Sequence, residues 1–86
     1  MKVGVTMDPL LGQIQLFAFG WPPQNWLPCE GQLLQITAYN ALYALLGTMF
    51  GGNGSTTFGL PDLRNANLAN GSKYCIAISG IFPQRY

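Results

Sequence analysis

Apolar and polar residues alternate over one stretch near the start of the chain. In residues 13–19, QIQLFAF, the side chains of Ile14, Leu16 and Ala18 fall on one face, and the intervening glutamines and phenylalanines fall on the other. A period of two residues is typical of a β-strand with two different faces. The pattern therefore predicts a strand over 13–19.

Three shorter segments also favour strands. Residues 32–36 are extended after a Glu-Gly turn, and residues 56–58 form a brief β-branched and aromatic run that Leu60 and Pro61 end. In residues 74–78 the side chains of Tyr74, Ile76 and Ile78 alternate with smaller ones, which predicts a closing strand.

A single helix is predicted at residues 38–47. Thr37 is a suitable N-cap residue, and Gly47 can adopt the left-handed conformation that ends a helix. The spacing of one helical face is followed by five apolar residues in and just after this stretch, namely Ala38, Leu42, Leu45, Leu46 and Met49. We expect this amphipathic helix to pack on the sheet.

Proline, glycine and asparagine mark the loops. Residues 20–28, GWPPQNWLP, contain three prolines, so we expect an ordered loop held in place by Trp21 and Trp26. Residues 51–54, GGNG, predict a loop with positive φ angles. Residues 65–72 are expected to form a surface connection, and residues 80–86 an irregular tail.

These elements predict an α+β, β-rich fold: a small sheet, one amphipathic helix at about residues 38–47, and long ordered loops. A chain of 86 residues makes one domain, residues 1–86, in which residues 1–7 are an N-terminal extension. Such a small core supplies only about 3 to 5 kcal/mol of stability, and small scaffolds usually gain the remainder from disulfides, metals or partner subunits. We therefore expect a partner.

Composition excludes several classes of partner. Only 8% of the residues are charged, against roughly 25% in an average soluble domain, while 49% are hydrophobic. The chain lacks the basic stripe that nucleic-acid binding requires, and no apolar run is long enough to span a bilayer. We expect neither nucleic acid nor membrane insertion, and no signal peptide is indicated, so synthesis in the cytoplasm is expected.

Catalytic residues are not indicated. The chain has no histidine, and its carboxylates are Asp8, Glu30 and Asp62. A glycosidase-like pairing of Glu30 with Asp62 is formally conceivable, but each lies at a turn, where a carboxylate commonly bonds backbone donors. We expect no catalytic residue, no cofactor and no metal site.

Two cysteines leave two alternatives open. Cys29 and Cys75 are too few for a disulfide framework or a four-ligand zinc site. The first alternative is a pair of buried free thiols, and the second is one long-range disulfide. Assembly in a reducing compartment favours the free thiols.

Glycine, proline and aromatic residues stand in specific arrangements in three runs of the chain: GQIQLFAF, PPQNWLPCEGQLLQI and ALYALLGTMFGGNGSTTFGLPDLR. These runs resemble the phage tail-collar family over residues 8–64. The ending YCIAISGIFPQRY, residues 74–86, resembles that of the collar-domain proteins of the microcystin-dependent type. The resemblance implies a structural motif made of Gly12, Ile14, Pro23, Trp26, Cys29, Gly31, Gln32, Leu45, Leu46, Gly47, Gly51, Gly52, Gly54, Phe58, Leu60, Pro61, Asp62, Leu63 and Arg64.

The chain departs from this family between the two regions. Longer relatives usually continue after Leu-Pro-Asp-Leu-Arg with a glycine-rich region, whereas here NANLANGSK stands in its place, as in a minimal version of the domain. Receptor binding in long fibre proteins belongs to the part beyond the collar. The resemblance therefore implies a structural core, in which the glycines reverse the backbone, Pro61 stops a strand and Arg64 bonds carbonyls or Asp62 locally.

Three functions follow as hypotheses. The first is a structural subunit of a phage tail, a tail fibre or a phage-tail-like particle, associated with copies of itself and with other tail or fibre proteins. The second is a subunit of a free extracellular filament, and the third is an adhesin that binds a cell-surface glycan through its many aromatic residues.

Residues 1–6, MKVGVT, suggest how copies associate. Val3 and Val5 alternate with Lys2, Gly4 and Thr6, which is a short β-capable pattern that cannot fold alone. Such a segment can add to an exposed sheet edge of an adjacent copy. We expect a homo-oligomer, with a trimer as the first expectation and an open polymer as the second.

Overall fold

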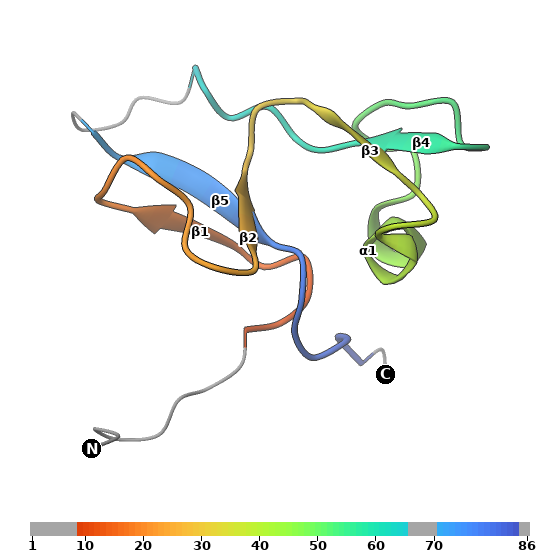
Figure 1. The fold of residues 1–86 in the computed structure, drawn as a ribbon, viewed down its shortest axis with the longest axis horizontal. Helices are drawn as coiled ribbons and strands as arrows, with labels where there is room; N and C mark the ends of the chain where they lie inside the picture. Colours follow the sequence, from red (N-terminus) through yellow and green to blue (C-terminus); the bar gives the residue numbers. More distant parts are fainter. Residues whose placement is uncertain (1–8, 66–70, 85–86) are drawn as a thin grey trace.

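In the part of the chain that the structure describes, the fold consists of two small antiparallel sheets and one short helix (Figure 1). The computed structural model describes residues 9–65 and 71–84. This architecture confirms the α+β, β-rich class but replaces the single expected sheet with two. The elements are β1 (Ile14–Phe17), β2 (Trp26–Pro28), β3 (Leu33–Gln35), α1 (Asn40–Leu46), β4 (Thr57–Gly59) and β5 (Lys73–Ala77).

Several expectations fall outside the described part of the chain. They concern the N-terminal extension at residues 1–7, most of the expected connection between residues 65 and 72, and the last two residues of the tail. Within the described residues, no helix has both the length and the hydropathy of a membrane-spanning segment.

The first sheet is built around β5. It lies between β1 and β2 and pairs antiparallel with both, so that Gln15 and Pro28 both face Cys75 across the sheet. On this central strand Cys75, Ile76 and Ala77 are all buried. The alternation near residues 13–19 correctly predicted β1, and that near 74–78 correctly predicted β5, each with shifted ends.

The assignment of residues 20–28 to a loop is wrong at its end, because Trp26–Pro28 is strand β2. Proline is tolerated there since β2 is an edge strand, where a missing N–H interrupts no ladder. The residues before it do form a loop, which Asn25 closes with a φ of 70°. Trp26 packs edge-on against Phe17, with 5.0 Å between ring centroids, whereas Trp21 is 67% exposed and does not pin the loop as expected.

The second sheet pairs β3 with β4, with Leu34 opposite Phe58. Both strands were predicted, each with a small shift in its ends. The loop before β4 packs back against it, because the N–H of Gly59 donates to the carbonyl of Gly51 at 2.9 Å. Phe58 is consequently enclosed and has no solvent exposure.

Helix α1 is shorter than predicted. It begins at Asn40, and Tyr39 occupies the N-cap position without any side-chain capping bond, so the prediction of Thr37 as N-cap is wrong. The preceding residues form a turn in which the N–H groups of Ala38 and Tyr39 both donate to the carbonyl of Gln35. Gly47 ends the helix as predicted, with a φ of 56°.

The core lies between the helix and the two sheets. Leu42 is the one residue of α1 that is buried, and Tyr43, Leu45 and Leu46 pack against the core while half-buried. Ala38 and Met49 are exposed, because the turn before α1 and the end at Gly47 take them off the helical face. The buried apolar cluster consists of Leu11, Cys29, Leu42, Phe58, Leu60 and Ile76.

The tail is more ordered than its sequence predicted. Ile81 forms a parallel bridge with Leu10, and its N–H donates to the carbonyl of Pro9 at 2.9 Å. Residue 80 has to be glycine, since a Cβ at this position would overlap with the carbonyl oxygen of Pro9. The segment before β1 is thereby anchored to the segment after β5.

The burial of Leu42 in helix α1 predicts a large effect of its substitution on stability. Leu42→Ala should lower the free energy of unfolding by about 2 to 5 kcal/mol, because it empties a fully enclosed position. Met49→Ala is the matched control, and its effect should stay within about 0.5 kcal/mol since Met49 is exposed. Urea denaturation followed by tryptophan fluorescence measures both, and equal losses would mean that α1 is rotated relative to this description.

Candidate functional site

The motif segments Cys-Glu-Gly-Gln and Leu-Pro-Asp-Leu-Arg lie side by side. Residues 29–32 run antiparallel to residues 60–63, and Glu30 and Asp62 face each other in a bridge. Three backbone bonds join the two segments: the N–H groups of Leu60, Gly31 and Leu63 donate to the carbonyls of Gln32, Pro61 and Cys29, at 3.0, 3.2 and 2.9 Å. We call this pairing the junction.

The junction connects the two sheets. At one end the N–H of Cys29 donates to the carbonyl of Tyr74 on β5, at 3.0 Å. At the other end the pairing continues into the second sheet, where Leu33 faces Gly59. Figure 1 shows the two segments running together between the sheets. The motif therefore forms the ladder that holds one sheet to the other.

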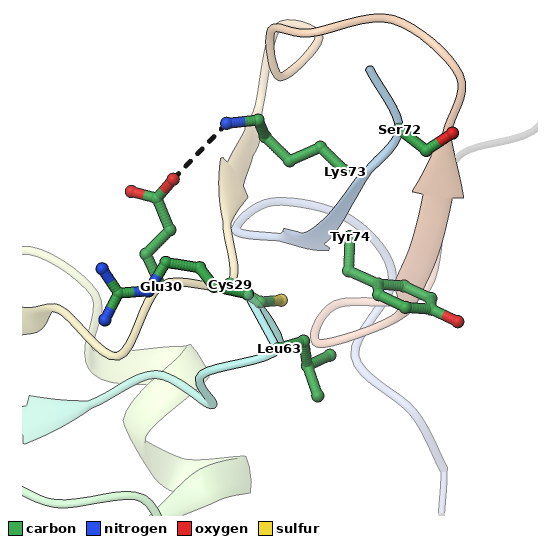
Figure 2. A pocket seen from close by; sticks show the side chains of 7 residues that line it. Cys29, Glu30, Leu63, Ser72, Lys73 and Tyr74 are labelled. Carbon is green, nitrogen blue, oxygen red and sulfur yellow. Dashed lines mark hydrogen bonds and ion pairs between the residues drawn. The ribbon is translucent and has the colours of Figure 1, made fainter. Parts of the chain in front are cut away.

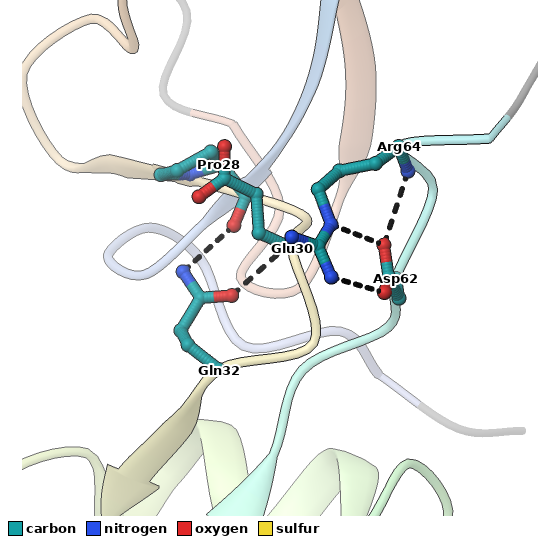
Figure 3. Close-up of polar contacts among 5 residues, drawn as sticks. All are labelled: Pro28, Glu30, Gln32, Asp62 and Arg64. Atoms are coloured by element: carbon teal, nitrogen blue, oxygen red, sulfur yellow. Dashed lines mark hydrogen bonds and ion pairs between the residues drawn. The ribbon is translucent and has the colours of Figure 1, made fainter.

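The side chain of Gln32 closes the turn within the junction (Figure 3). Its Nε2 donates to the carbonyl of Pro28 at 2.9 Å, and its Oε1 accepts a bond from the N–H of Glu30 at 3.1 Å. Gly31 has a φ of 75°, and a Cβ there would lie 3.1 Å from the Cβ of Asp62. Gly31 thus allows the positive φ angle of this turn, and the side chain of Gln32 forms hydrogen bonds with the backbone groups of the turn.

Arg64 and Asp62 form a local clamp beside the junction (Figure 3). Two side-chain bonds from Arg64, at 2.9 and 2.8 Å, hold the carboxylate, which also accepts a bond from the N–H of Arg64. These bonds lower the pKa of Asp62 to about 2. The expected local bonding of Arg64 to Asp62 is confirmed, and because both side chains are exposed, the ion pair itself contributes little stability.

A second group of motif residues surrounds the loop at 51–54. Gly51, Gly52 and Gly54 have positive φ angles as predicted, and a Cβ on Gly52 would collide with the backbone of Phe58. Asn53 organises this loop, because its Oδ1 accepts bonds from three backbone N–H groups, those of Ser55, Thr56 and Thr57. Asn53 is not among the motif residues predicted from the sequence, although an asparagine between glycines is a signal for such a turn.

Other motif residues lie away from both groups. Pro23 and Trp26 hold the loop before β2, where the N–H of Trp26 donates to the carbonyl of Pro23 at 3.1 Å. Gly12 lies against the helix, since a Cβ there would be 3.4 Å from Leu45. Ile14 is on an edge strand and is exposed. The structure therefore divides the motif into the junction, the glycine loop with the helix end, and the edges of the first sheet.

A small pocket opens next to the junction (Figure 2). Its volume is about 140 Å³, and Nζ of Lys73 lies 3.5 Å from Oε2 of Glu30 at its rim. Glu30 is thus paired with Lys73, as Asp62 is paired with Arg64. The only pairing shown between Glu30 and Asp62 is the backbone bridge, so the conceivable glycosidase pair gains no support. The lining residues are Cys29, Glu30, Leu63, Arg64, Ser72, Lys73 and Tyr74.

A larger shallow groove of about 580 Å³ lies along β1 of the first sheet. Phe17 and Trp26 line it together with the amide side chains of Gln13 and Gln15, and none of its lining residues is charged. Aromatic rings and amides are groups that can contact a neutral saccharide.

The two cysteines are buried and unbonded. Because Pro28 faces Cys75 across the sheet, Cys75 shares a face with Pro28, and Cys29, the next residue, points to the opposite face. Burial, followed by the nearby Cys75, raises the pKa of Cys29 to about 11, and burial also raises the pKa of Cys75. Both groups are therefore protonated, unreactive thiols at neutral pH.

Comparison with known proteins identifies the family to which these motifs correspond. The family model described as the phage tail collar domain matches residues 12–68, which include the whole junction and the glycine loop. Protein RhiB of Rhizobium leguminosarum bv. viciae is similar to this chain, with 41% identity over 44 residues. The similar segment covers 48% of this chain and 20% of RhiB, so most of RhiB has no counterpart here.

The burial of the two cysteines and their position on opposite faces of the sheet predict how they react with an alkylating reagent. Alkylation of native protein at neutral pH should be slow at both thiols, because both are enclosed and protonated. After denaturation without a reductant, mass spectrometry should find both cysteines labelled. Denatured protein that accepts no label would show a disulfide, which would contradict the register described here.

Proposed function

Because this chain belongs to the phage tail collar domain family, we propose that it is a structural subunit of a phage tail, a tail fibre or a phage-tail-like particle, and that it acts by self-assembly and not by catalysis. The match to the family over residues 12–68 carries the proposal. We propose that residues 1–86 form a single domain, in which residues 1–7 are an extension available to a neighbouring subunit. The virion, or an extracellular particle of the same kind, is its proposed location.

The use of the motif residues supports a scaffold role. Gly31, Gln32 and Leu63 serve backbone pairing within the junction, and Gly52 allows the loop to approach Phe58. Among the described residues, no group of three or more potential metal ligands is present. The carboxylates of Glu30 and Asp62 are each held by a cation of the same chain. We propose that the motif serves the fold, and that function resides in contacts between subunits.

The surface supports association with copies of itself or with other tail and fibre proteins. Large apolar side chains such as Trp21, Leu33 and Met49 are exposed in a chain of which only 8% of the residues are charged. An uncharged surface with exposed aromatic and aliphatic groups is typical of surfaces that other subunits cover. A free extracellular filament is the second candidate, favoured by an unpaired edge of the first sheet.

Electron microscopy and light scattering test this proposal. We expect the purified chain to have a mass of three or more subunits in solution, and antibodies against it to decorate tail-like particles from the producing strain. Long filaments formed by the purified chain alone, without such particles, would support the second candidate. A monomer at every concentration reached, with no labelled particle, would contradict self-assembly.

A further inference from the structure

The outer edge of β1 is unpaired. In the strand order β1-β5-β2, β1 is the first strand, and no residue in 9–65 or 71–84 pairs with its outer side. The N–H of Ala77 donates to the carbonyl of Gln13, so Gln13, Gln15 and Phe17 direct their backbone groups to β5. The N–H and C=O groups of Ile14 and Leu16 therefore point outward, where a further strand would lie.

The opposite edge of the same sheet is closed. On β2 the outward positions are Trp26 and Pro28, because Asn25 bonds to Ile78, the residue after β5, and Cys29 bonds to Tyr74 on β5. The N–H of Trp26 is already bonded to the carbonyl of Pro23, and Pro28 has no N–H. The carbonyl of Pro28 accepts a bond from Gln32 at 2.9 Å. An added strand would thus find N–H donors at β1, whereas neither outward position of β2 offers a free N–H.

The side chains of β1 also suit a partner. Ile14 is 42% exposed and Leu16 is 44% exposed, and both lie on the same face of the strand. Edge strands usually carry a charged residue, a proline or a bulge that prevents pairing, and β1, with the sequence IQLF, has none of these residues. An open and partly apolar edge of this kind is suited to strand addition.

The N-terminal segment, which lies outside the described part of the chain, indicates what binds the edge of β1. Residues 1–8 join the fold at Pro9, which lines the shallow groove together with Gln13 and Gln15 of the β1 segment. Val3 and Val5 are two positions apart, as are Ile14 and Leu16, so one face of an extended segment can cover the two exposed side chains. Lys2 is the one charged residue in positions 1–6, so the segment brings little charge to the contact.

We propose that the outer edge of β1 accepts residues 3–6 of a second copy as a fourth strand, in which Val3 and Val5 cover Ile14 and Leu16. This inference rests on the proposed self-assembly, and it names both sides of the contact. Since the donating segment and the accepting edge are different surfaces of each copy, the contact is head-to-tail. Each copy in a chain of subunits then donates one strand and accepts another.

Two complementary variants test the inference. The edge-blocked chain carries Ile14→Lys and Leu16→Lys, which place charges on side chains that are already exposed. The donor-blocked chain carries Val3→Asp and Val5→Asp. Met49→Lys is the control for an added charge at an exposed apolar site away from β1, and Thr6→Asp is the control on the other face of the donating segment.

Light scattering after size-exclusion chromatography measures the outcome. Each blocked chain alone should have the mass of one subunit, and an equimolar mixture should have twice that mass, because only one donor and one edge remain. Both controls should assemble like the unmodified chain. Circular dichroism spectra identical to that of the unmodified chain show that the blocked variants are folded.

These measurements distinguish a failure of the proposed contact from a failure of the proposed self-assembly. An unmodified chain that assembles, together with blocked chains that still assemble or a mixture that does not pair, would overturn the contact between residues 3–6 and β1 while leaving self-assembly intact. An unmodified chain that is monomeric would overturn both, and would be the result if residues 3–6 paired with β1 of their own chain.

Discussion

The pairing of residues 29–32 with residues 60–63 is the constraint on which the rest of the structure depends. Among the described residues the second sheet has two strands, and a sheet of that size is marginally stable at best on its own. The junction links the two sheets through Cys29, Leu60 and Leu63, whose backbone groups bond across it. Cys29 and Leu60 are also buried in the core, so the same residues supply the hydrogen bonds and part of the apolar contact. A small chain thereby obtains one core in place of two weak ones.

The parts of the fold that depend on local chemistry could be predicted from the sequence. Alternation located β1 and β5, Gly47 marked the end of the helix, and the glycines at 51–54 indicated positive φ angles. Each of these signals comes from residues within a few positions of one another. The local bonding of Arg64 to Asp62 was also within reach, because the two residues are two positions apart.

The parts that depend on distant pairing could not be predicted in the same way. The three prolines of residues 20–28 predicted a loop where β2 lies. This segment is a strand because β5, almost fifty positions away in the sequence, pairs with it. The bridge between Leu10 and Ile81 joins the two ends of the described chain, and nothing in the tail sequence indicates it. The division into two sheets likewise follows from pairing order and not from periodicity. The motif residues were recognised as a set, but their meeting at the junction became apparent only in three dimensions.

Hydrogen exchange of backbone amides tests the central role of the junction most directly. We predict that the amides of Leu60 and Leu63 exchange as slowly as that of Ala77 in the first sheet and that of Ile36 beside the second. All four should respond alike to low concentrations of denaturant. Such behaviour means that both sheets and the junction open as one unit. Junction amides that exchange much faster than the others, with the two sheets opening at different denaturant concentrations, would contradict the account.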